Sequence, residues 1–116
     1  MPIETSGIYC RPLTVKDKNE VIESIANSFC MRNPLLKSLK LSKKERYEYA
    51  TYAAMFLADN KSSGAFDGDN DEQLCGVQIN CSSYFVPDID LEKYLQSVSP
   101  KTQYLIRVMT FVMHLY

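Results

Sequence analysis

Three aspartates at alternate positions, Asp67, Asp69 and Asp71, are the side chains whose type and spacing could most directly bind a cation. Calcium-binding loops with this spacing of carboxylates also need a glycine at the sixth place and a bidentate glutamate at the twelfth. Counted from Asp67, these places hold Glu72 and Gln78. We therefore predict no metal site in this stretch and interpret it as the solvated tip of a hairpin.

Thiol and imidazole side chains are the next candidates for metal binding or catalysis. The four cysteines stand at positions 10, 30, 75 and 81 without a Cys-x-x-Cys pair, and His114 is the one histidine of the sequence. Structural zinc takes four ligands at closer spacing, and no Gly-x-Ser-x-Gly elbow or Cys/His/Asn set indicates a hydrolytic triad. We expect free, buried thiols, as in a reducing compartment, with no metal and no triad chemistry.

Phosphate binding also finds little support in the sequence. The four glycines, at positions 7, 64, 68 and 76, never form a Gly-x-Gly-x-x-Gly cluster or a P-loop. A run of cations surrounds an expected helix start, at Lys37, Lys40, Lys43, Lys44 and Arg46. Since exposed aromatic residues do not alternate with them, we interpret the run as a solvated surface, and an anionic ligand there stays an alternative.

Length and charge exclude several classes of protein. At 116 residues with 46% hydrophobic residues, the chain fits one compact domain with its own core. The net charge of −1 provides no field for a polyanion, so we expect neither nucleic acid nor an anionic membrane as partner. Residues 1–7 are too short and polar for a signal peptide, and no apolar run approaches the roughly 18 residues of a membrane span. We expect a soluble, cytoplasmic protein.

A strand and a helix are predicted to open the fold. Residues 8–13 have the aromatic and β-branched content of a strand that ends near Pro12. Thr14 offers an N-cap with Asp17 in the reciprocal place of a capping box. A helix should follow, because apolar residues recur there with a period of 3.6. This core-facing stripe consists of Val21, Ile22, Ile25, Ala26, Phe29 and Cys30.

Pro34 must end this helix, because proline restricts the preceding residue to extended geometry and cannot continue the helix behind it. A second helix should begin a few residues later, with Ser42 and Glu45 as its capping box. We expect the side chains of residues 29–35 to turn inward at this corner. Since a corner between two helices over a sheet suits a small-ligand pocket, we predict a binding site there.

The second helix should turn Tyr47, Ala50, Ala54 and Leu57 toward the core and end near Asp59. We interpret its tyrosines, at positions 47, 49 and 52, as residues of the core or its rim rather than of a ligand site.

Residues 65–66 and 73–81 are predicted as the antiparallel strands of a hairpin, with Cys75, Val77, Ile79 and Cys81 sharing one face. Helices should follow over residues 90–96 and from Pro100, with Ser99 as N-cap of the last one. The apolar stripe of the last helix consists of Tyr104, Leu105, Val108, Met109, Val112 and Met113. Because this pattern still continues at Tyr116, we expect the chain to be part of a longer domain.

This order of elements resembles the opening half of the GNAT superfamily of N-acetyltransferases. Residues 9–14, Tyr-Cys-Arg-Pro-Leu-Thr, are similar to its first strand with an Arg-Pro-Leu-Thr exit. Residues 28–35, Ser-Phe-Cys-Met-Arg-Asn-Pro-Leu, resemble the Phe-x-x-x-Glu-Pro-Leu corner of the arylalkylamine (dopamine-type) branch, and residues 74–79 resemble its Val-Gly-Val-Ala strand. The resemblance implies an α/β (α+β) fold: a strand, two helices, an antiparallel hairpin and C-terminal helices in one partial acetyltransferase-like domain over residues 1–116.

The resemblance also implies a function: the complete protein would transfer an acetyl group from acetyl-CoA to a primary amine, whose pocket would be lined by Phe29, Arg32, Asn33 and Leu35. In that branch a glutamate before Pro-Leu is implicated as the base, whereas Asn33 cannot act as a general base and can at most orient the nitrogen or a water. We assign no catalytic residue. The family's acetyl-CoA loop, Gln/Arg-x-x-Gly-x-Gly/Ala at a helix start, has no match, so we expect this chain alone to bind no cofactor and to be inactive.

A second hypothesis belongs to another class of protein. A non-enzymatic α/β module would cover an open sheet edge by forming a homodimer or by taking up a partner's strand. The strand over residues 74–81 and the apolar C-terminus would then be contact surfaces. A degenerate acetyltransferase fold that acts as a regulatory binder is a third alternative, and the residues leave all three open.

Overall fold

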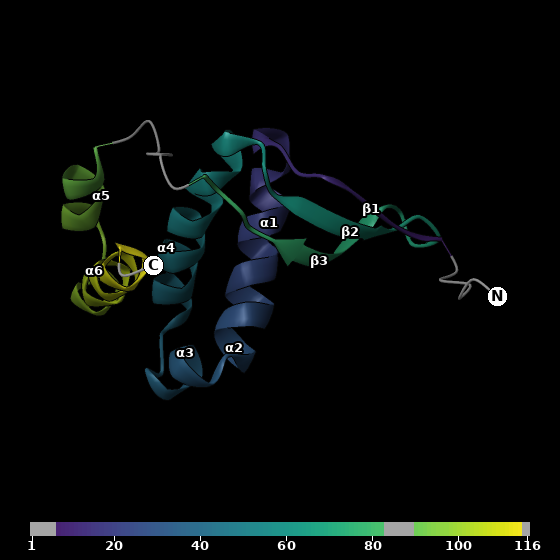
Figure 1. The fold of residues 1–116 in the computed structure, drawn as a ribbon. Coiled ribbons are helices and arrows are strands. Elements are labelled where there is room, and N and C mark those ends of the chain that lie inside the picture. The colour runs from purple at the N-terminus through teal and green to yellow at the C-terminus, as the bar shows by residue number, and fades with distance from the viewer. Residues whose placement is uncertain (1–6, 83–89, 115–116) are drawn as a thin grey trace.

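The computed structural model describes residues 7–82 and 90–114, with side chains as far as Val108. It shows an α+β fold, in which an antiparallel sheet lies at one end and the helices lie side by side next to it (Figure 1). This confirms the predicted fold class. Within the described ranges, no helix is long and apolar enough to cross a membrane.

The sheet has three antiparallel strands in the order β1 (Ile8–Pro12), β2 (Ser63–Asp67) and β3 (Gln73–Gln78). The predicted first strand and hairpin are therefore confirmed, although β3 ends before Cys81. A shift of register next to Ala65 marks a bulge in the hairpin. β1 and β3 are the outer strands of the sheet that the described residues form.

The acidic turn between β2 and β3 is held by its own hydrogen bonds. Asp67 Oδ1 accepts from the backbone amide of Asp69 at 3.0 Å, and the Asp67 carbonyl accepts from that of Asn70 at 3.1 Å. Asp71 and Glu72 have positive φ angles of 55° and 57°, as tight turns require. In the described part of the chain, no group of three or more His, Cys, Asp or Glu side chains could hold a metal ion.

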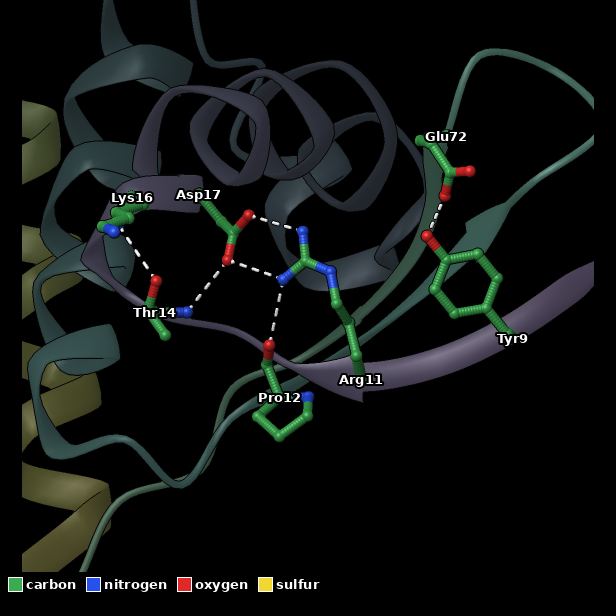
Figure 2. A network of polar contacts seen from close by, with 7 residues as sticks. All are labelled: Tyr9, Arg11, Pro12, Thr14, Lys16, Asp17 and Glu72. Carbon is green, nitrogen blue, oxygen red and sulfur yellow. Dashed lines mark hydrogen bonds and ion pairs between the residues drawn. The ribbon is translucent and has the colours of Figure 1, made fainter.

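A network at the exit of β1 attaches the sheet to the first helical turn, η1 (Val15–Asp17) (Figure 2). Arg11 donates to both carboxylate oxygens of Asp17, at 3.1 and 2.9 Å, and its guanidinium lies 4.0 Å from the ring centre of Phe66. Asp17 also accepts from the backbone amide of Thr14 at 2.9 Å, so the predicted capping box is confirmed. The hydrogen bonds from Arg11 are the main reason why the pKa of Asp17 lies below its usual value.

One helical rod then runs through α1 (Lys18–Ser24), a π-helical turn η2 (Ile25–Phe29) and α2 (Cys30–Arg32). The sequence pattern predicts a plain α-helix and does not indicate the wider turn. Within that turn, the carbonyl of Ala26 accepts a hydrogen bond from Nε of Arg46 at 3.1 Å. Because π turns are rare and disturb the regular backbone ladder, this bond from α4 stabilises an otherwise costly conformation.

The corner predicted at Pro34 is confirmed. Asn33 has extended geometry, with ψ at 125°, and Pro34 takes the first position of a short helix, α3 (Pro34–Ser38). The sequence pattern did not indicate α3. Proline suits a first helical position, so the chain enters a new helix directly after it breaks the old one.

The expectation that residues 29–35 turn inward is wrong for Met31 and Leu35, whose side chains are about half exposed. Phe29, predicted in the core stripe, is also 47% exposed, because the π turn changes the register of the side chains around it. At the start of α3, it is Leu36 that is buried.

The next helix, α4 (Lys43–Ala54), begins with the predicted capping box. Ser42 Oγ accepts from the Glu45 amide at 3.1 Å, and Glu45 Oε1 accepts from the Ser42 amide at 2.8 Å. These bonds hold the pKa of Glu45 below its usual value. The helix continues as η3 (Met55–Asp59), which ends at Asn60 in the left-handed conformation.

The last helices, α5 (Leu91–Ser97) and α6 (Pro100–His114), lie on the side of α4 away from the sheet (Figure 1). Their predicted starts are confirmed, with Asp90 capping α5 and Pro100 in the first position of α6.

The predicted apolar stripe of α6 is partly wrong. Tyr104 is 68% exposed, whereas Ile106, which the pattern did not include, is fully buried beside Leu105. Burial on α6 depends on which side of the helix faces α4, and the spacing of apolar residues alone does not determine this side. Its further members, Met109, Val112 and Met113, lie outside the described side chains.

Candidate binding pocket

An open pocket of about 770 Å³ lies where the α1–η2–α2 rod, α4 and β3 meet. Its walls are mainly apolar and aromatic, with a few polar groups, as in sites for small organic ligands. The pocket is lined by Asn33 at the corner and by residues of β3. It therefore occupies the region for which the sequence predicts a binding site.

Three of the predicted site residues, Phe29, Arg32 and Asn33, line this pocket together. Leu35 does not line it, because α3 begins at once and directs this exposed side chain elsewhere. The assignment of these residues to an amine stays a prediction. Their juxtaposition follows from the rod and the proline corner.

The side-chain oxygen of Asn33 is already engaged in the fold. Asn33 Oδ1 accepts hydrogen bonds from the backbone amides of Leu35 and Leu36, at 3.0 and 3.2 Å, and so caps α3. This leaves its Nδ2 group, a donor, for a ligand or water. Asn33 thus shapes the corner first and can contact a ligand only as a donor.

A row of polar groups runs along the rod into the pocket. Ser24, Ser28 and Arg32 follow one another at intervals of four residues and all line the pocket. Across residues 7–82 and 90–108, none of their side chains makes a hydrogen bond, and the guanidinium of Arg32 forms no ion pair. These groups are available to a ligand.

Two tyrosines of α4, Tyr49 and Tyr52, form the wall opposite the rod. Both are buried, as the sequence predicts for core or rim residues, but they also line the pocket, which the sequence did not indicate. Burial, followed by the nearby Cys30 and Tyr52, raises the pKa of Tyr49 to about 12. The Tyr49 hydroxyl therefore stays protonated at neutral pH and can serve as a donor, not as a base.

The floor of the pocket comes from β3 and the residues after it. Cys75, Val77, Ile79 and Cys81, which the alternation of the sequence places on one face, all line the pocket. Cys75 donates a weak hydrogen bond to the carbonyl of Ala65 at 3.3 Å. The alternation along β3 thus predicted correctly that these residues share one face. It did not indicate that this face would lie in the same pocket as Phe29.

N-cap side chains accept from some of the backbone amides at the helix starts. Pyrophosphate binding at a helix start uses such amides, and the cap residue accepts from one of them at the starts of η1, α4 and α5 and from two at the start of α3. At the start of α6, the Ser99 amide donates to the carboxylate of Glu48.

The sequence matches no protein-family model, and no curated protein is significantly similar to it.

Proposed function

We propose that this chain supplies the acceptor-binding side of a GNAT-type N-acetyltransferase, which transfers an acetyl group from acetyl-CoA to a primary amine. The observation that carries the proposal is the position of the pocket. It lies at the Asn33-Pro34 corner, whose sequence resembles the amine-side motif of the arylalkylamine branch, and it is lined by residues of the strand that resembles that branch's Val-Gly-Val-Ala strand. The antiparallel order of β1, β2 and β3 around a helical connection is compatible with that assignment.

In this proposal the pocket holds and orients the amine. The apolar walls would bind its body, while the hydroxyl oxygens of Ser28 and Tyr49 would accept hydrogen bonds from its nitrogen. No carboxylate or imidazole belongs to the described pocket lining, so the pocket supplies position rather than a base. We accordingly propose that the chain alone gives no turnover.

Two titrations of the isotope-labelled chain test the proposal. Primary amines with an aromatic body should shift the backbone NMR signals of Ser28, Phe29 and Val77, and calorimetry with acetyl-CoA should give no binding heat. If no amine changes the signals of the pocket, the acceptor assignment is wrong. Micromolar binding of acetyl-CoA would instead contradict the prediction that this chain alone binds no cofactor.

An alternative function is a non-enzymatic module that pairs through its sheet. β3 is an outer strand among the described residues, and an outer strand offers unpaired backbone groups to a second copy or to a partner's strand. Light scattering separates the two proposals, because a stable symmetric dimer favours the module and a monomer that binds amines favours the acceptor site. For either, we propose a cytoplasmic location, in keeping with the free thiols of Cys10 and Cys75 at the surface.

A further inference from the structure

The charge of the side chains that line the pocket limits which class of ligand can bind there. Among the lining residues that the structure describes, Arg32 is the one charged side chain, and it is a cation. A simple alkylamine is protonated at neutral pH, so it would meet a like charge there and no counter-ion. An amine that carries no other charge should therefore bind in this pocket more weakly than an amine that also carries a carboxylate.

We infer that Arg32 forms a carboxylate subsite, and that the acceptor is a small amino acid with an aromatic or aliphatic side chain. The anionic part of this inference rests on Arg32, and its amine part rests on the proposed function. An α-amino acid brings its own counter-charge, so its ammonium group needs no acid in the pocket wall. Its carboxylate can accept two parallel hydrogen bonds from the planar guanidinium.

The neighbours of Arg32 support this assignment. Ser28 lies one helical turn before Arg32 on the same side of the rod, and its hydroxyl is free to donate to the same carboxylate. Since the Arg32 side chain has no protein partner among the described residues, a ligand would not have to break an existing ion pair.

The remaining walls suit the side chain of such an amino acid. Phe29 from the rod, Phe56 from η3, and Val77 and Ile79 from the sheet side present aromatic and branched apolar surface. A benzyl or branched aliphatic group would bury apolar area against them, while the charged end stays at Arg32. The pocket thus has one apolar and one cationic end.

The inference is tested by titrating three ligands into the isotope-labelled chain. Phenylalanine carries an ammonium group and a carboxylate, phenethylamine carries the ammonium group alone, and 3-phenylpropionate carries the carboxylate alone. Phenylalanine should bind about fivefold more tightly than phenethylamine, which is the scale of one exposed ion pair. All binding is followed by the NMR signals of Ser28, Phe29 and Val77.

Two matched arginine variants separate the subsite from a general effect of charge. Arg32→Gln should remove the advantage of phenylalanine over phenethylamine, and it should bind 3-phenylpropionate about fivefold more weakly than the unchanged chain does. Arg107→Gln, which alters an exposed arginine paired with Glu92 outside the pocket lining, should leave both affinities unchanged. Urea unfolding of Arg32→Gln at an unchanged midpoint excludes a loss of fold.

The outcomes distinguish this inference from the proposed function. The carboxylate subsite is overturned if phenylalanine and phenethylamine bind equally tightly. It is also overturned if the Arg32→Gln variant binds phenylalanine and 3-phenylpropionate as tightly as the unchanged chain does. Either result leaves the amine site in place. Binding of 3-phenylpropionate without either amine supports the subsite and contradicts the proposed function. If none of the three ligands shifts the pocket signals, the inference is wrong.

Discussion

The carboxylate of Glu48, on α4, accepts a hydrogen bond from the hydroxyl of Thr102, on α6, at 2.9 Å. The same carboxylate accepts from the backbone amide of Ser99 at 3.1 and 3.2 Å, and the Glu48 carbonyl accepts from the Tyr94 hydroxyl at 2.7 Å. Thr102 is fully buried. Glu48 therefore acts as the N-terminal cap of α6 from another helix and joins the C-terminal pair of helices to α4.

Replacing Glu48 by alanine should lower the free energy of unfolding by about 1–3 kcal/mol, because the buried Thr102 hydroxyl and the Ser99 amide lose their acceptor. Urea denaturation followed by circular dichroism measures this. The control is Glu92→Ala, which removes an exposed pair with Arg107 and should cost less than about 0.5 kcal/mol. Equal losses in the two variants would show that Glu48 has no special role.

Tyr94 and Tyr49 offer a second matched pair. Tyr94→Phe removes a hydrogen bond to the Glu48 carbonyl and should cost about 1 kcal/mol, whereas Tyr49→Phe removes a hydroxyl that has no partner among the described residues and should cost close to nothing. Thermal unfolding at pH 7 checks both. A Tyr49→Phe variant as unstable as Tyr94→Phe would contradict the free hydroxyl in the pocket.

The same tyrosines predict a loss of stability in alkali. Burial raises the pKa of Tyr94 and of Tyr49 to about 12, so the folded state favours the protonated phenol. Their contribution is complete below the unfolded pKa of about 10 and is lost as the pH rises from there through the folded value. Tyr94→Phe should therefore flatten the fall in unfolding free energy above about pH 10. An unchanged slope would contradict the raised pKa.

Asp17 predicts the opposite dependence at acid pH. Its pKa is lowered mainly by the hydrogen bonds from Arg11, so its contribution is complete above about pH 4 and is lost as the pH falls through the folded value. Asp17→Asn should cost about 1 kcal/mol at neutral pH and much less near pH 2. A constant cost of Asp17→Asn across this range would contradict the ion pair.

Thiol labelling tests the burial of the cysteines. Cys10 and Cys75 are exposed, so the expectation of buried thiols is wrong for these two. Cys30 is buried, and burial raises its pKa to about 11. At pH 8 Cys30 should react with an aromatic disulfide about 100-fold more slowly than an ordinary exposed thiol, since a pKa of about 11 lowers its thiolate fraction by that order. Mass spectrometry of digested samples assigns the sites. Comparable rates at Cys30 and Cys10 would contradict the packing of the rod against α4.

The elements that sequence reasoning predicted best are those with local causes. The Thr14 and Ser42 capping boxes, the break at Pro34 and the alternation along β3 each depend on residues a few positions apart. Such causes do not depend on how distant elements pack. They also placed Phe29, Arg32 and Asn33 at the corner where the pocket lies.

Features that depend on contacts between distant residues were not predictable. The π turn is stabilised by a bond from Arg46 to Ala26, and no local pattern announces it. Tyr49 reaches the pocket only because the rod and β3 meet α4 there. The burial of Ile106 instead of Tyr104 likewise depends on which side of α6 meets α4.

The pocket between the rod, α4 and β3 is proposed to receive a small ligand. Intermolecular nuclear Overhauser effects between phenylalanine and the carbon-labelled chain test it most directly. The ring protons of the ligand should give contacts to the Val77 and Ile79 methyl groups and to the Phe29 ring. Contacts confined to α5 and α6, or no contacts at ligand saturation, would contradict the claim.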